Sequence, residues 1–122
     1  MILKAIAIDD DPVSIMMVKK LSESVKDLNL ASTYDNPIEG AAGIILDKPD
    51  LLFLDIEMPE FNGVEIMKSL KKPPKIIVIS GNPNFKDESL GLNAVAFISK
   101  PADEQLFIDA VEAVRTICIN EA

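Results

Sequence analysis

Histidine is absent from this 122-residue sequence, and cysteine occurs only once, as Cys118. A zinc site built from cysteine and histidine is therefore excluded, because such sites need several of these side chains. A single cysteine also cannot form a disulfide within the chain. The lack of an internal disulfide fits a reducing compartment, and we expect the protein to be cytoplasmic.

Long apolar runs and clusters of basic residues are also missing. No run approaches the ~20 apolar residues of a membrane-spanning helix, and the first run meets Asp9 too early to form a secretory signal. The sequence has 12 Lys and Arg against 20 Asp and Glu, which gives a net charge of −8. Nucleic acids and anionic membranes are bound through clustered Lys and Arg, so we expect neither as a direct partner. The excess of acid favours a cation site instead.

Apolar side chains are abundant and make up 48% of the sequence. At this length one hydrophobic core is expected, and no repeat or linker interrupts the chain, so residues 1–122 are predicted to form a single domain. Short β-branched or leucine-rich runs alternate with stretches of helical character. Because parallel strands need crossover helices, the alternation predicts a parallel sheet covered on both sides, a three-layer α/β sandwich. The expected strands span residues 2–8, 28–34, 51–54, 76–79 and 95–99.

Helices are predicted between these strands. The first begins where Asp11 can cap it and Pro12 can occupy its first position. Helices are also expected over residues 37–47, 64–71 and 103–119, whereas residues 84–92 have little periodicity and should form the weakest helix. In the last helix an apolar stripe is expected to face the core, formed by Leu106, Ala110, Ala113 and Ile117.

Polar residues follow four of the five predicted strands. Ligands of doubly wound sheets bind at the carboxyl ends of the strands, so these residues are the candidates for a functional site. Ordinary structural explanations exist for some of them: Asp11 can cap a helix, residues 80–83 can form a turn, and a strand-end lysine is often solvated. The candidates are Asp9, Asp10 and Asp11 after the first strand, Asp55 and Glu57 after the third, Ser80 after the fourth and Lys100 after the fifth.

Helix capping cannot explain Asp9 and Asp10 as well as Asp11, because one helix start uses one cap. Two like charges ~4 Å apart repel by about 4 kcal/mol at an intermediate effective dielectric, so a positive charge must compensate them. Magnesium prefers oxygen ligands and characteristically uses one or two carboxylates, for which Asp10 and Asp55 are the candidates. Beside such an ion, a carboxylate can act as a nucleophile toward phosphorus. In this hypothesis Asp55 is the nucleophile, and Ser80 and Lys100 bind the phosphoryl oxygens.

Four motifs in this order resemble the receiver domains of two-component response regulators: IAIDDDP, LLFLDIEMPEFNG, VISG and AFISKP. The resemblance covers essentially the whole chain, and its specificity comes from the four motifs falling on successive strand ends. The segment NPNFKDESLGLNAVAFISKP particularly resembles receivers attached to LytTR-type DNA-binding domains. The resemblance implies a flavodoxin-like fold with strand order 2-1-3-4-5. It also implies that a sensor histidine kinase phosphorylates the domain in a Mg²⁺-dependent reaction.

The resemblance assigns a role to each site residue. Asp55 would be the phosphorylated aspartate and Asp10 a direct metal ligand, while Asp9 would act largely through water and Glu57 through its backbone carbonyl. Ser80 and Lys100 would hold the phosphoryl group. The family catalyses only its own phosphorylation and dephosphorylation, so turnover of a substrate, as by an enzyme, is not expected.

The resemblance also implies how the signal is passed on. Ser80 and Phe97 match the switch positions, although Phe97 could equally be an ordinary core aromatic. The face formed by helix four, strand five and helix five would contact either a second copy or an output domain outside this chain.

The peptide bond between Lys100 and Pro101 is expected to be cis. Serine at position 80, where threonine is frequent, and an acid at position 57 depart from the commonest pattern. We hypothesise that Glu57 and Asn82 flank the water path to the phosphoaspartate.

Two other functions remain open at this point. Asp9 and Asp11 form a D-x-D pair like that of magnesium-dependent phosphohydrolases, but Val13 stands where those enzymes have threonine, and the chain is too short for their cap elements. A degenerate receiver that only binds partners would usually lack an acid or the lysine, and all are present here. The sequence names neither the kinase nor the output pathway.

Overall fold

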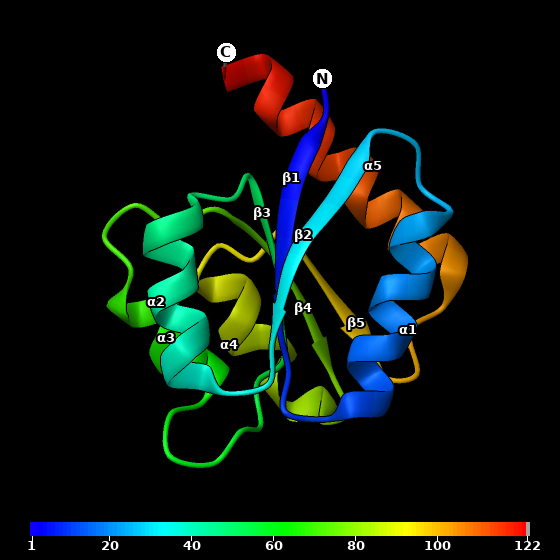
Figure 1. Ribbon diagram of the computed structural model, residues 1–122. Coiled ribbons are helices and arrows are strands. Elements are labelled where there is room, and N and C mark those ends of the chain that lie inside the picture. Colours follow the sequence, from blue (N-terminus) through cyan, green and yellow to red (C-terminus); the bar gives the residue numbers. More distant parts are fainter. Residues whose placement is uncertain (122) are drawn as a thin grey trace.

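Strands and helices alternate along the whole computed structural model, which describes residues 1–121. The strands pair in parallel in the order β2-β1-β3-β4-β5, which confirms the predicted fold (Figure 1). A short 3₁₀ turn, Pro83–Phe85, precedes the fourth helix. The elements are β1 (Leu3–Ile8), α1 (Pro12–Glu23), β2 (Leu28–Tyr34), α2 (Pro37–Asp47), β3 (Leu51–Leu54), α3 (Gly63–Ser69), β4 (Lys75–Ser80), α4 (Lys86–Gly91), β5 (Ala96–Ser99) and α5 (Glu104–Glu121).

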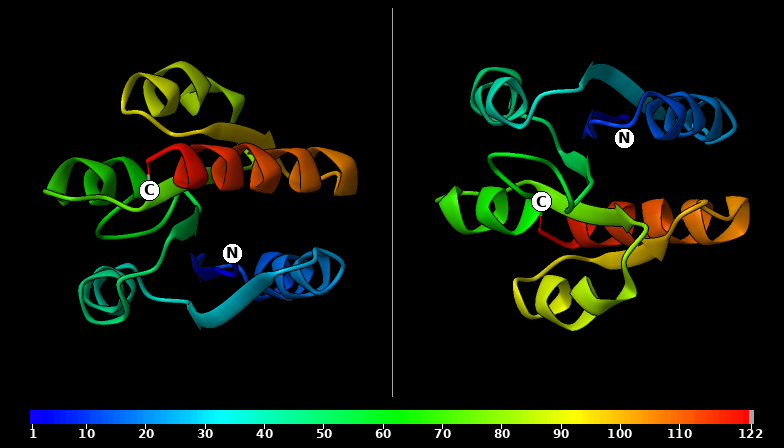
Figure 2. Two further views of the ribbon diagram at one scale, coloured as in Figure 1. Left: turned by 90° about the horizontal axis from the view of Figure 1, so that it is seen from above. Right: turned by 90° about the horizontal axis from the view of Figure 1, so that it is seen from below.

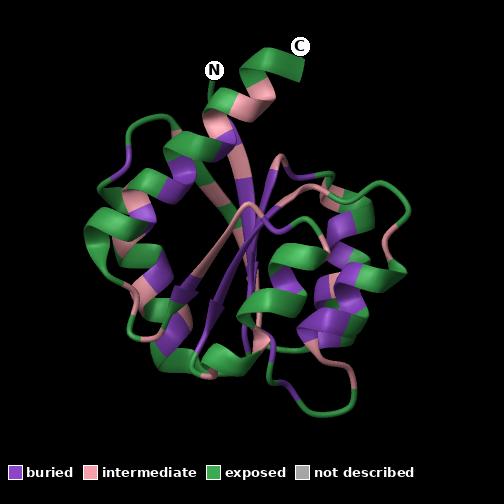
Figure 3. Ribbon diagram, turned by 180° about the vertical axis from the view of Figure 1, so that it is seen from behind, coloured by how far each residue is buried: buried purple, intermediate pink, exposed green. Residues whose placement is uncertain are grey.

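Two hydrophobic cores lie on opposite faces of the sheet. Helices α1 and α5 cover one face of the sheet, and α2 and α3 cover the other, with α4 beside them (Figures 1 and 2). Their apolar side chains form one core on each face. The rings of Phe53 in β3 and Phe107 in α5 stack with centroids 4.9 Å apart. The middle strands are buried along their length (Figure 3), as expected for parallel strands covered on both faces. Among residues 1–121, no helix combines the length and the apolar character that crossing a bilayer requires.

Local sequence signals set where the helices begin. The side chain of Asp11 accepts a hydrogen bond from the backbone N–H of Val13, and Pro12 occupies the first position of α1, as predicted. Asn36 caps α2 in the same way. Gly43 lets α2 approach the sheet closely, because a Cβ there would overlap the ring of Tyr34. The weak periodicity of residues 84–92 corresponds to the short helix α4.

The apolar stripe predicted for the last helix is wrong by one position. Leu106 is 55% exposed and Ala113 is also exposed, whereas Ala110 is buried and Ile117 is half-buried. The stripe that faces the core is Phe107, Ala110, Val111 and Val114. Both sets have helical spacing, so periodicity does not choose between them. In the observed orientation of α5, Phe107 faces the sheet and its ring stacks on Phe53.

Candidate functional site

Backbone hydrogen bonds extend the sheet past the strand ends and hold the candidate residues there. The N–H of Asp9 donates to the carbonyl of Tyr34, and the N–H of Asp55 donates to the carbonyl of Ile8. At the other side of the site, the N–H of Lys100 donates to the carbonyl of Ser80. The backbone of each of these residues is therefore fixed by a neighbouring strand.

Three carboxylates meet at this edge of the sheet. Oxygen atoms of Asp9, Asp10 and Asp55 all lie within 4.8 Å of one another. Asp9 and Asp55 are only 4% and 5% exposed, whereas Asp10 is exposed. Part of Asp9 is used structurally, because its Oδ1 accepts a hydrogen bond from the N–H of Asp11. The sequence-based expectation that Asp10 and Asp55 come together is confirmed.

Lys100 reaches into this cluster from the end of β5. Its Nζ lies 3.0 Å from Oδ2 of Asp9 and 3.4 Å from Oδ1 of Asp55. Burial alone would lower the pKa of Lys100, but the hydrogen bond to Asp9 and the charges of Asp55 and Asp9 outweigh it and raise the pKa. The lysine therefore remains charged and compensates part of the acid cluster.

The charge of the cluster is not fully compensated. Within residues 1–121, Lys100 is the only cation that forms a salt bridge with the cluster, and it pairs with Asp9 and Asp55 but not with Asp10. Burial, and then the neighbouring charge of Asp9, raises the pKa of Asp55 from its ordinary value to about 7, although Lys100 acts in the opposite direction. Carboxylate oxygens are the ligands that Mg²⁺ prefers, and a divalent cation would supply the missing positive charge. The residues of this site therefore fit a bound magnesium ion.

Ser80 is completely buried at the end of β4. Its Oγ accepts a hydrogen bond of 3.1 Å from the N–H of Asn82, and the side chain of Asn82 accepts one from the N–H of Asn84. These two bonds are the turn chemistry that the sequence indicated. Within residues 1–121, no hydrogen bond joins the Ser80 hydroxyl to the acid cluster.

Glu57 lies in the loop after β3, and Phe97 lies in β5. The roles that the sequence assigned to them remain predictions. The side chain of Glu57 is exposed and does not belong to the carboxylate cluster. The metal-binding role predicted for Glu57 concerns its backbone carbonyl oxygen and not this side chain. Glu57 lines a shallow cavity of about 410 Å³ together with Met58, Pro59, Asn62 and Phe85. Phe97 is half-buried and packs against the same core cluster as Phe85. The Lys100–Pro101 peptide bond is cis, as expected.

Gly63 is a site residue that the sequence did not reveal. A Cβ on Gly63 would overlap the carbonyl oxygen of Asp55 and would lie 2.9 Å from the Cα of Ile56. The N–H of Gly63 also donates to the carbonyl of Ile56. The start of α3 therefore packs closely against the backbone of Asp55 and Ile56. The Asn62–Gly63 pair indicated only a helix start, because the close approach depends on tertiary structure.

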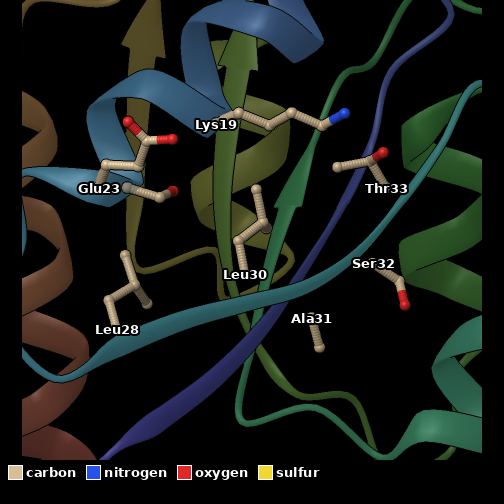
Figure 4. Close-up of a pocket in the computed structure, with 8 residues that line it drawn as sticks. Lys19, Glu23, Leu28, Leu30, Ala31, Ser32 and Thr33 are labelled. Carbon is tan, nitrogen blue, oxygen red and sulfur yellow. The ribbon is translucent and has the colours of Figure 1, made fainter.

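A second cavity, of about 390 Å³, lies away from this cluster between α1 and the edge strand β2 (Figure 4). Lys19 and Glu23 line it from α1, and Leu28, Leu30 and Thr33 line it from β2. None of the predicted site residues lines this cavity. It is therefore separate from the candidate site.

Fold and site together define a class: a doubly wound α/β domain with an acid cluster and a lysine at the carboxyl ends of its parallel strands. The family model of the response regulator receiver domain matches residues 5–112. The chain belongs to this family, and it is thus a receiver domain of two-component signalling.

Curated relatives and solved structures agree with this assignment. The chain is 27% identical over 113 residues to the sensory transduction protein LytT of Bacillus anthracis, covering 90% of this chain and 46% of that protein. It is 27% identical over 116 residues to the transcriptional regulatory protein LytR of Staphylococcus aureus strain N315, covering 93% and 47%. The chain thus spans about half the length of these relatives. The predicted similarity to LytTR-type regulators is confirmed.

Among solved structures, the response regulator domain of Thermotoga maritima CheB superimposes with a TM-score of 0.81 at 27% identity, covering 95% of this chain and 96% of that chain. The response regulatory domain of mrkE from Klebsiella pneumoniae gives a TM-score of 0.85 at 22% identity, covering 94% and 97%. The second likeness supports the fold alone.

Proposed function

We propose that this receiver domain accepts a phosphoryl group on Asp55 from a phosphohistidine of a sensor kinase in a Mg²⁺-dependent reaction. The observation that carries the proposal is the placement of Asp55: it is buried, lies within 4.8 Å of two other carboxylates, and has the ammonium of Lys100 3.4 Å away. Burial and an acidic neighbour mark a carboxylate that needs a cation to stay ionised.

The proposed roles are those that the resemblance to receiver domains assigns to each residue. Asp10 and Asp55 would hold the magnesium ion directly, Asp9 largely through water, and Glu57 through its backbone carbonyl. When bound, the ion would offset the negative charge that the incoming phosphoryl group adds. An oxygen of Asp55 attacks phosphorus, the P–N bond of phosphohistidine breaks, and its electron pair returns to the imidazole nitrogen. Lys100 and Ser80 then bind phosphoryl oxygens.

Phosphorylation would act as a switch through Ser80 and Phe97. It adds roughly two negative charges and new acceptor oxygens. Ser80, whose Oγ accepts a hydrogen bond from the N–H of Asn82, would donate its own hydroxyl hydrogen to the phosphoryl group, and the half-buried Phe97 would turn inward. The face of α4, β5 and α5 would then contact a second copy or an output domain. The name of the relative LytR suggests transcriptional output, and such a domain would lie outside this chain.

We infer that the protein turns over no external phosphate ester and works in the cytoplasm. The phosphohydrolase alternative needs a second catalytic acid at Asp11. The side chain of Asp11 instead caps α1 through Val13 and is not a member of the three-carboxylate cluster. The family itself supports self-phosphorylation and a kinase partner.

The proposal is tested by incubating the protein with acetyl phosphate and Mg²⁺ and measuring its intact mass. We expect a gain of one phosphoryl group that disappears when EDTA replaces Mg²⁺. Asp55→Asn should remain folded by circular dichroism and gain nothing, whereas Asp11→Asn should still be phosphorylated. Equal modification of the wild type and Asp55→Asn would refute the proposal.

A further inference from the structure

A groove of about 780 Å³ lies between the C-terminal ends of α2 and α3. Its apolar part includes Ile44, Pro49, Leu70 and Pro74, of which Ile44 and Pro49 are buried and the other two half-buried. Pro49 and Pro74 precede β3 and β4, whereas the acid cluster follows β1 and β3, so the groove lies at the opposite end of the sheet from the cluster. Figure 1 shows the two ends of these strands. A volume of this size admits several side chains of a partner.

The outer surface of α2 extends this groove with exposed apolar side chains. Ile45 lines the groove and is 69% exposed, and its neighbour Leu46 is 80% exposed. Neither side chain contributes to the buried core of the domain. Adjacent exposed apolar residues beside a concave surface are typical of a protein interaction site.

The rim of the groove is basic although the protein is acidic. Lys48, Lys71 and Lys72 line it and are exposed, in a chain whose net charge is −8. None of the three forms a salt bridge within residues 1–121, whereas Lys68, Lys75 and Lys100 do. None of the aspartates and glutamates of residues 1–121 lines the groove. The rim thus presents three lysines that have no salt-bridge partner within residues 1–121.

We propose that this groove binds an acidic amphipathic helix of a partner protein. The apolar side chains of such a helix would enter between α2 and α3, and its acidic flanks would pair with the lysines of the rim. Salt bridges between the acidic flanks of the helix and Lys48, Lys71 and Lys72 would account for the position of these lysines beside the exposed side chains of Ile45 and Leu46. Because Asp55 and Ser80 lie at the far end of the strands, a partner bound here leaves the acid cluster accessible.

The test uses a synthetic helical peptide with leucines spaced i, i+3, i+4 and i+7 and glutamates on the remaining positions. Its binding to ¹⁵N-labelled protein is followed by amide chemical shifts and by fluorescence anisotropy. We expect shifts centred on the residues of the groove and an affinity that weakens as salt is added. Lys71→Glu together with Lys72→Glu should weaken binding about tenfold.

Matched controls separate this surface from general effects of charge. Lys19→Glu together with Lys20→Glu, two exposed lysines of α1, should leave the affinity unchanged. A peptide with lysines in place of the glutamates should bind at least about tenfold more weakly. All variants should still be phosphorylated by acetyl phosphate, so failure of this proposal can be told from failure of the phosphorylation site.

Four results would overturn the proposal. These are no shifts at the groove residues, equal binding of the acidic and basic peptides, sedimentation of the protein with phosphatidylglycerol vesicles that depends on Lys71 and Lys72, and self-association that is abolished by the same double variant. The last two results would assign the surface to an anionic membrane or to a second copy of the chain.

Discussion

At the residue scale, Asp55 is under opposing electrostatic influences. Its pKa is raised from 3.8 to about 7, first by burial and then by Asp9, while Lys100 lowers it. Between these two pH values the folded protein binds a proton on Asp55 that the unfolded chain has released. The contribution of this group to stability is therefore complete below about pH 3.8 and is lost as the pH rises through about 7.

This linkage gives a prediction for the magnesium-free protein. Asp55→Asn cannot ionise, so we expect its free energy of unfolding to exceed that of the wild type at pH 8 by roughly 1–3 kcal/mol and to converge with it near pH 4. Urea unfolding in EDTA at several pH values measures the difference. Asp87→Asn, at an exposed position in α4, is the matched control. Parallel profiles for the wild type and Asp55→Asn would contradict the argument.

The predictable part of the site consists of residues that directly follow strands. Asp9, Asp55 and Lys100 were found because parallel strands bring their carboxyl ends together, whatever the details of packing. Gly63 was not found, because its role depends on the distance between α3 and the carbonyl of Asp55. The sequence also did not indicate that Lys100 lies nearer to Asp9 than to Asp55. Such preferences arise from side-chain positions within the folded site.

At the element scale, the start of α3 packs closely against the backbone that carries Asp55. We expect Gly63→Ala to destabilise the protein by about 1–3 kcal/mol and to slow its phosphorylation, because the added methyl group displaces the Asp55 carbonyl. Gly91→Ala is the control, since a Cβ there meets nothing within 4 Å. Urea unfolding and acetyl phosphate labelling measure both effects. Equal behaviour of the two variants would show that Gly63 is not needed for close packing.

The orientation of α5 is a second prediction at this scale. Phe107 is fully buried and stacks on Phe53, whereas Leu106 is 55% exposed. Phe107→Ala should therefore cost about 3–5 kcal/mol of stability, and Leu106→Ala should change it by less than about 0.5 kcal/mol. Chemical denaturation of both variants gives these values. A larger loss of stability for Leu106→Ala than for Phe107→Ala would contradict this orientation of α5 and would support the stripe predicted from the sequence.

Sequence periodicity alone could not choose between the two stripes of α5. Leu106–Ala110–Ala113 and Phe107–Ala110–Val114 both have helical spacing, and the difference is a rotation by one residue. Strand bounds were better determined: residues 28–34 and 51–54 form strands as predicted, because β-branched and leucine-rich runs end abruptly at polar residues. The helix over residues 37–47 was also predicted, since Asn36 and Pro37 mark its start.

At the scale of the whole molecule, the parallel sheet separates two surfaces with different chemistry. The carboxyl ends of the strands collect Asp9, Asp10 and Asp55, whereas the opposite end carries the groove with Lys71 and Lys72 on its rim. The layered architecture was predictable from the alternation of strand and helix. The groove was not, because it depends on how the ends of α2 and α3 meet in space. The placement would allow the proposed partner to bind at one end while the proposed phosphorylation occurs at the other.

The central claim is that one aspartate of the clustered acids, Asp55, carries the phosphoryl group. The most direct test is to phosphorylate the protein with acetyl phosphate and Mg²⁺, reduce it with borohydride, and locate the product by tandem mass spectrometry. Reduction of an aspartyl phosphate yields homoserine, so the account predicts homoserine at position 55. Homoserine at Asp9, Asp10 or Asp11 instead would contradict it.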